Sequence, residues 1–95
     1  MKNTTQVNVF IDELKHGSTF TRCNAAFVLG KMGEQAVPAL IDALASEQAE
    51  VRKYAAYALG RIGDSKAVVA LKEASRDTHR AVAKWAADAL NAIEE

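Results

Sequence analysis

The sequence of 95 residues contains one cysteine, one proline and no long apolar run. A single cysteine, Cys23, excludes an internal disulfide and is typical of a reducing compartment. No stretch approaches the roughly 18 apolar residues that a membrane-spanning helix needs. Residues 1–6 also lack the apolar segment of a signal peptide. We therefore expect a cytoplasmic protein that has no membrane partner.

The sequence also lacks an excess of charge of either sign. Twelve Lys and Arg residues balance 12 Asp and Glu residues, so the formal net charge is +0 at pH 7. A balanced chain has no general attraction for a polyanion or for a membrane surface. The charge balance therefore speaks against nucleic acid as a partner.

What the sequence does contain is a repeat. The segment 22–33 (RCNAAFVLGKMG) returns thirty residues later as 52–63 (RKYAAYALGRIG), and a weaker copy follows over 82–93 (VAKWAADALNAI). A fixed period of this length is typical of a solenoid, in which one helical unit stacks on the next. The length allows one domain. We therefore expect a single domain over 1–95, with repeats at about 6–33, 35–63 and 66–93.

The spacing of the apolar residues predicts an all-α fold. These residues recur three and four positions apart, which indicates six helices in three hairpins. The first helices of the hairpins are expected over 6–16, 36–46 and 66–76, and the second helices over 19–32, 50–62 and 80–93. The predicted architecture is an α-solenoid of three stacked hairpins.

Small residues mark the packed face and the ends of the second helices. Alanine pairs at 25–26, 55–56 and 86–87 predict close packing between neighbouring helices. Gly33 and Gly63 are expected to end their helices. Gly30 and Gly60 are expected where the next repeat comes close. The third copy lacks both glycines, so we expect the array to end there and the chain to be a complete three-repeat protein.

These motifs resemble a known repeat family. The segment 51–64 (VRKYAAYALGRIGD), followed by Ala67, Val68 and Leu71, looks like a HEAT repeat. It is similar in particular to the short HEAT-like repeats of phycobilin lyase subunits and of small bacterial and archaeal proteins. The resemblance extends from about Val7 to Ile93. It implies an α-solenoid whose second helices line the concave side, and functions that are mostly protein binding and scaffolding.

Aromatic and charged residues occupy positions of the second helices that the core does not need. Such positions are expected to face out on the concave side, where aromatic rings flanked by Lys or Arg are typical of binding anchors. The candidate partner-binding residues are Phe27, Lys31, Lys53, Tyr54, Tyr57, Arg61, Lys84, Trp85 and Asp88. A second interpretation stays open, in which two or three of these rings cover the helix seams. Of the other aromatics, Phe10 is expected in the core and Phe20 packed at a helix start.

No catalytic constellation is visible in the sequence. His16 and His79 fall in or near different hairpin turns, without the paired spacing of metal ligands. HEAT-like hydroxylases bind iron through His-Glu dipeptides, and the sequence has none, so the resemblance does not imply that activity here. Cys23 has no base at helical spacing. It is expected as a half-buried thiol or, where exposed, as a cross-link between chains. We therefore predict no enzymatic activity, no cofactor and no metal.

The sequence thus predicts a non-enzymatic interaction or scaffold module that binds a partner protein or peptide on its concave face. Two alternatives stay open. The repeat type allows a bilin lyase-like or chromophore-handling factor, and the basic residues of the second helices allow a nucleic-acid binder. The terminal hairpins, with Val7 and Val9 at one end, also predict self-association.

Overall fold

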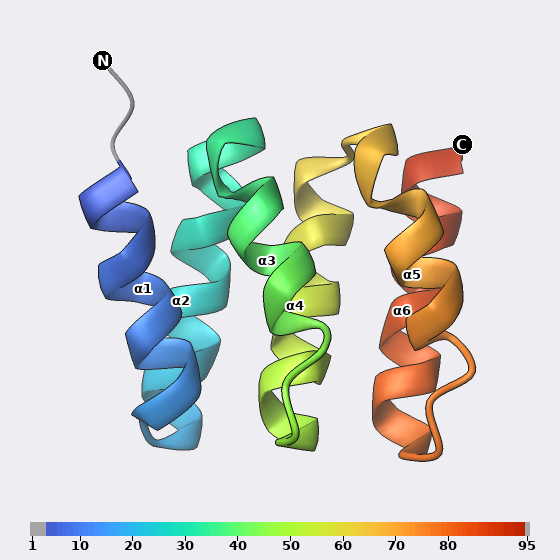
Figure 1. Ribbon diagram of the computed structural model, residues 1–95, viewed down its shortest axis with the longest axis horizontal. Helices are drawn as coiled ribbons and strands as arrows, with labels where there is room; N and C mark the ends of the chain where they lie inside the picture. The colour runs from blue at the N-terminus through green and yellow to red at the C-terminus, as the bar shows by residue number, and fades with distance from the viewer. Residues whose placement is uncertain (1–3, 95) are drawn as a thin grey trace.

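The computed structural model describes residues 4–94 and shows three helical hairpins lying side by side (Figure 1). The hairpins pair α1 (Thr4–His16) with α2 (Thr19–Met32), α3 (Val37–Ala43) with α4 (Ala49–Ile62), and α5 (Val68–Ala74) with α6 (Arg80–Glu94). Figure 1 shows α1, α3 and α5 in one layer and α2, α4 and α6 in a second layer behind it. The expected all-α solenoid is confirmed, and no strand occurs over 4–94. The ends of the predicted domain, residues 1–3 and 95, lie outside the described residues.

The first helices of the second and third hairpins are shorter than expected. Short 3-10 segments, Gly33–Ala36 and Ser65–Ala67, precede α3 and α5. Gly63 ends α4 in the left-handed helical conformation, with φ 76° and ψ 20°. Gly33 also has a positive φ, 80°, but its ψ of −151° leads the chain directly into the 3-10 segment. The periodicity predicts which residues turn inward but does not distinguish a tight 3-10 turn from an α-helical one.

The core lies between the two layers and consists mainly of leucine and alanine. The largest fully buried leucines are Leu14, Leu29, Leu40, Leu59 and Leu71. The alanine pairs at 25–26 and 55–56 are 0% exposed. In the third copy Ala86 is buried but Ala87 is exposed, because α6 is the last described helix and no described helix covers that side. Small side chains at these positions allow the helix axes to approach closely.

Three expectations about apolar side chains have different outcomes in the structure. Phe10 packs against the core, as predicted, and is half-buried. Phe20 was expected to pack at a helix start, but it is 83% exposed on the first turn of α2. Val7 was expected to be free for self-association, but it is 2% exposed and belongs to the core, whereas Val9 is exposed. In α1 these two valines lie on opposite sides of the helix, because residues two positions apart do not share a face.

At each of the two junctions between hairpins, one arginine links a hairpin to the next one. Arg52 donates from Nε and Nη2 to the two carboxylate oxygens of Asp77, at 2.7 and 3.1 Å. Its Nη1 donates to the carbonyls of Ser46 and Glu47. The hydrogen bonds from Arg52, and secondarily the N–H of His79, lower the pKa of Asp77 although partial burial opposes this shift. The pair fixes α4 relative to the third hairpin.

The first junction has a neutral counterpart of this link. Arg22 donates to the carbonyls of Leu14 and Lys15, and its Nη2 donates to the Gln48 side-chain oxygen at 3.0 Å. Of the two arginines, Arg52 thus has an acidic side-chain partner and Arg22 a neutral one.

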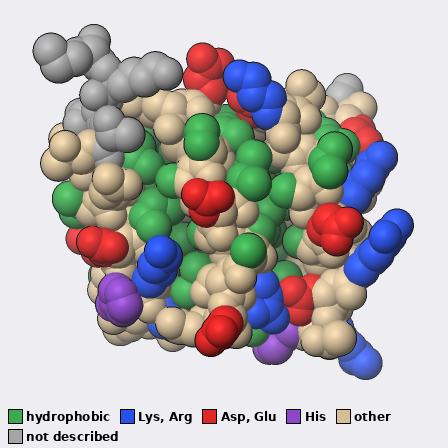
Figure 2. Space-filling view, in the orientation of Figure 1, with side chains coloured by type: hydrophobic (Ala, Val, Ile, Leu, Met, Phe, Trp, Pro, Cys, Tyr) green, Lys and Arg blue, Asp and Glu red, His purple; other side chains and the backbone are tan. Residues whose placement is uncertain are grey.

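The outer surface carries mixed charge. Figure 2 shows the layer of α1, α3 and α5, where acidic and basic side chains are interspersed among hydrophobic ones. Histidine side chains appear at two separate places on this view. Over 4–94 no helix is long and apolar enough to cross a membrane.

Candidate functional site

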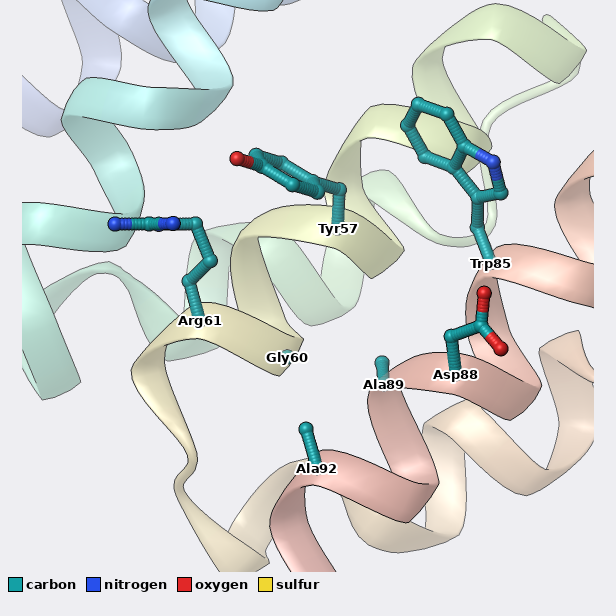
Figure 3. Close-up of a pocket in the computed structure, with 7 residues that line it drawn as sticks. All are labelled: Tyr57, Gly60, Arg61, Trp85, Asp88, Ala89 and Ala92. Carbon is teal, nitrogen blue, oxygen red and sulfur yellow. The ribbon is translucent and has the colours of Figure 1, made fainter.

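A pocket of about 430 Å³ opens between α4 and α6 on the side of the second layer. Its lining residues are Tyr57, Gly60, Arg61, Trp85, Asp88, Ala89 and Ala92 (Figure 3). The floor of the pocket is formed where Gly60 of α4 and Ala89 of α6 are in close contact. A Cβ added to Gly60 would lie 2.9 Å from the Ala89 Cβ, so there is no room for a larger residue than glycine. Tyr57 and Trp85 stand on either side of this floor. The volume falls in the range of about 300–1,000 Å³ that small-molecule sites occupy.

The two rings that line the pocket, Tyr57 and Trp85, belong to a cluster of three rings with Tyr54. Trp85 packs edge-on against Tyr54, with centroids 5.5 Å apart and an interplanar angle of 84°. It lies 5.8 Å from Tyr57 at a tilt of 52°. Tyr54 is only 6% exposed and belongs to the core, so the expectation that its position faces out is wrong. Tyr57 and Trp85 are half-buried and keep part of their surface in the pocket.

Three of the four cations predicted to flank the rings, Lys31, Lys53 and Arg61, lie over ring faces. The Lys53 ammonium lies 4.9 Å from the Trp85 centroid and 5.0 Å from that of Tyr54. The Arg61 guanidinium lies 5.0 Å from the Phe27 centroid and 5.9 Å from that of Tyr57. Each such contact contributes about 0.5–1 kcal/mol at exposed sites. Figure 3 shows the Arg61 guanidinium directed away from the pocket opening.

The acidic residue that lines the pocket is Asp88. Its carboxylate accepts from the Lys84 ammonium at 3.3 Å, and the two side chains are 61% and 70% exposed. Lys53, by contrast, pairs with Glu50 at 3.3 Å with its own side chain only 17% exposed. The ion pair between Asp88 and Lys84 is therefore exposed to solvent, and another cation can readily replace Lys84.

The nine predicted residues separate into distinct environments. Tyr57, Arg61, Trp85 and Asp88 line the pocket. Lys53 and Lys84 contact two of these four, Trp85 and Asp88, from outside the opening. On α2, Phe27 is 40% exposed and contacts both Arg61 and the Lys31 ammonium, 5.3 Å from its ring centroid.

The residues missed by sequence reasoning are the small ones at the base of the pocket. Ala89 and Ala92 lie on one face of α6, three positions apart, opposite Gly60 of α4. The sequence marked Gly60 as a point of close approach, which is correct, but not as a pocket floor. The sequence signal that could have identified the base of the pocket is the pair of alanines three positions apart on α6, together with the glycine of α4.

The described residues hold no cluster suited to a metal ion. His16 ends α1 and His79 precedes α6, in different turns. Over 4–94 no three His, Cys, Asp or Glu side chains lie together in a way that could bind a metal. Cys23 is exposed, so the half-buried alternative for this thiol is wrong.

Comparison with known proteins identifies the family. The family model for HEAT repeats matches residues 7–91, and the chain belongs to this family. Deoxyhypusine hydroxylase of Schizosaccharomyces pombe (strain 972 / ATCC 24843) is 39% identical over 95 residues, which cover 97% of this chain and 30% of that protein. The structure of human deoxyhypusine hydroxylase in complex with glycerol matches with a TM-score of 0.77 and 34% identity. That match covers 93% of this chain and 32% of the human chain.

These relatives overturn the predicted function. Both are named for an enzymatic activity, so the interpretation as a non-enzymatic interaction or scaffold module is wrong, and so is the prediction of no enzymatic activity. The two alternatives, chromophore handling and nucleic-acid binding, gain no support from these relatives. The error came from equating a missing catalytic constellation with a missing activity. A chain that spans about 30% of its curated relative can contribute to catalysis without containing the reacting groups.

Proposed function

We propose that the chain serves an enzyme of the deoxyhypusine hydroxylase kind as a HEAT-repeat unit that holds the substrate. The observation that carries this proposal is the 39% identity to the fission yeast enzyme across 97% of the chain. The similarity extends over all three hairpins instead of one repeat motif. A cytoplasmic location is part of the proposal and is supported by the single cysteine.

The pocket between α4 and α6 suits the substrate in that enzyme's name. Deoxyhypusine is a lysine whose side-chain nitrogen carries an aminobutyl group, so it presents a flexible aliphatic chain with a secondary ammonium within it and a primary ammonium at its end. Such a chain needs apolar contacts for its methylene groups and a negative or π-rich wall for its charge. Ala89 and Ala92 offer the first, and Tyr57, Trp85 and Asp88 offer the second.

The described residues do not fit an iron centre of the kind that HEAT-like hydroxylases build from His-Glu dipeptides. His16 stands between Lys15 and Gly17, and neither neighbour is Glu. His79 is likewise flanked by Thr and Arg, and no cluster of three ligands occurs over 4–94. We therefore derive no step of oxygen chemistry through these residues. The role that we propose for them is to bind and orient the substrate side chain.

Calorimetric titration with two matched peptides tests the proposal. One peptide carries deoxyhypusine and the other carries lysine at the same position. We expect the deoxyhypusine peptide to bind about tenfold more tightly, because only its longer side chain reaches the pocket. Ala92→Leu narrows the opening and should remove the difference, whereas Ala45→Leu, an equal change at an exposed position after α3, should preserve it. Equal affinity of the wild type for both peptides would contradict the proposal.

A further inference from the structure

We infer that Asp88, together with the rings of Tyr57 and Trp85, binds the terminal primary ammonium of an aminoalkyl chain. This inference rests on the proposed function for its biological setting, but its physical basis is the pocket itself. Asp88 lines one side of the opening, the two rings stand above the floor, and the methyl groups of Ala89 and Ala92 face the space between them (Figure 3). Carboxylate, ring faces and methyl groups are what an alkylammonium requires for charge, polarisation and methylene contact.

The protein's own lysines show that both recognition elements accept a primary ammonium. Lys53 places its ammonium 4.9 Å from the Trp85 centroid, from outside the pocket. Lys84 places its ammonium 3.3 Å from a carboxylate oxygen of Asp88. A single ligand in the pocket would make both kinds of contact at once, with its methylene groups over Ala89 and Ala92. The surroundings of Trp85 and Asp88 are thus already used for ammonium groups.

Arg61, the cation that lines the pocket, is engaged with two ring faces. Arg61 contributes to the lining, but its guanidinium stacks on Phe27 and Tyr57 and is directed toward α2 (Figure 3). Its aliphatic part packs beside Gly30, where a Cβ would lie 3.2 Å from the Arg61 Cβ. Among the residues that line the pocket, Asp88 therefore supplies the charged group that can receive a ligand ammonium, in exchange for its solvent-exposed partner Lys84.

Lys84 competes with the ligand for the Asp88 carboxylate in this arrangement. It occupies Asp88 when no ligand is present, so a ligand ammonium must displace it. Both side chains are exposed, at 70% and 61%, and an exposed pair of this kind is weak. Lys84 therefore acts as an internal competitor. Removing it should strengthen binding, and removing Asp88 should weaken it.

Fluorescence of Trp85 measures this directly, because it is the one tryptophan in the sequence. The probe is 1,4-diaminobutane, and 1-butanol serves as the uncharged comparison. We expect a saturable change with the diamine and none with the alcohol. Asp88→Asn should weaken binding about tenfold and Lys84→Gln should strengthen it about two- to fivefold. Glu73→Gln, an equal loss of charge on the exposed side of α5, should leave it unchanged.

The outcomes separate the inference from the proposed function. Absence of a saturable signal, or equal diamine affinity of the Asp88→Asn variant and the wild type, overturns the inference. Circular dichroism of each variant confirms that the fold is retained, as expected for exposed side chains. Diamine binding with equal affinity for the deoxyhypusine and lysine peptides contradicts the proposed function alone. Preference for the deoxyhypusine peptide that persists unchanged in Asp88→Asn contradicts the inference alone.

Discussion

The two junctions between hairpins begin from the same motif and end with different chemistry. At the second junction Arg52 forms two hydrogen bonds with the carboxylate of Asp77, and both side chains are mostly buried, at 18% and 12% exposure. At the first junction Arg22 meets the neutral, exposed amide of Gln48. The comparison shows that an arginine repeated in two copies can cap backbone carbonyls in both and yet be an ion-pair partner in one copy alone.

The glycines at the two junctions, Gly30 and Gly60, also differ in what they contact. Gly60 faces the backbone and methyl group of Ala89, whereas Gly30 faces the flexible side chain of Arg61. Only the second junction carries the ring of Trp85 between neighbouring hairpins. The pocket opens at this junction, where the walls are fixed by the ion pair, the ring cluster and the close helix contact. A site needs such fixed walls to hold a ligand in one geometry.

The largest effect is expected from breaking the charged link. Arg52→Ala removes the partner of a mostly buried carboxylate and leaves the Ser46 and Glu47 carbonyls without that donor. We expect a loss of about 2–4 kcal/mol in the free energy of unfolding. Arg22→Ala should cost less, about 1–2 kcal/mol, because its side-chain partner is neutral and exposed. Urea unfolding of both variants measures the difference, and equal losses would contradict the comparison.

A smaller effect is expected from the paired glycine substitutions. In Gly60→Ala the new methyl group lies 2.9 Å from the Ala89 Cβ and 3.0 Å from its Cα, so helix α6 must shift. We expect a net loss of about 1–2 kcal/mol despite the better helix propensity of alanine. In Gly30→Ala the nearest atom is the Arg61 Cβ at 3.2 Å, so α4 has to move by only a few tenths of an ångström, and the better helix propensity of alanine keeps stability near that of the wild type.

Thermal unfolding followed by circular dichroism compares the two glycine variants. Equal melting temperatures would show that the junctions are packed alike, contrary to the contacts described. The Gly60 variant should also lose diamine binding, since the pocket floor moves with α6.

The smallest effect is a pH dependence confined to the second junction. The folded-state pKa of Asp77 lies below its ordinary value, so its contribution to stability is complete above the unfolded-state pKa of about 3.9 and is lost as the pH falls through the folded-state value. The stability difference between the wild type and Asp77→Asn should therefore shrink below about pH 4. Urea unfolding at pH 7 and at successively lower pH measures it.

A matched change sharpens the same test. Gln48→Glu places a carboxylate near Arg22 and should introduce a weaker pH dependence of the same sign at the first junction. Its effect at pH 7 should stay within about 1 kcal/mol, because that site is exposed. A difference between wild type and Asp77→Asn that is constant with pH would remove the electrostatic explanation.

Sequence periodicity was sufficient for the solenoid and for most of the core. Leu29 and Leu59 recur with the repeat and are fully buried, as predicted. Periodicity was insufficient for the candidate site, because the side to which an aromatic side chain points depends on the packing of the neighbouring hairpin. Tyr54 and Tyr57 both lie on α4 outside the alanine pair, yet Trp85 packs edge-on against the first and leaves the second at the pocket.

The functional prediction failed for a related reason. It weighed the sequence pattern, in which no catalytic constellation and no paired metal ligands are visible, and inferred no enzymatic activity. The relatives show that segments of this kind form part of an enzyme about three times longer. Individual residues carry no signal for such membership, because HEAT repeats serve many functions with one packing pattern.

The sequence by itself determined the number of hairpins, their order and most of the residues that face inward, because burial of a periodic apolar face is a local property of each helix. Only the tertiary structure decided which partner each junction arginine meets, which rings stay open and where the pocket lies. Those outcomes depend on contacts between side chains far apart in the chain, such as Trp85 with Tyr54 and Arg52 with Asp77. The packing of one hairpin against the next brings those side chains together.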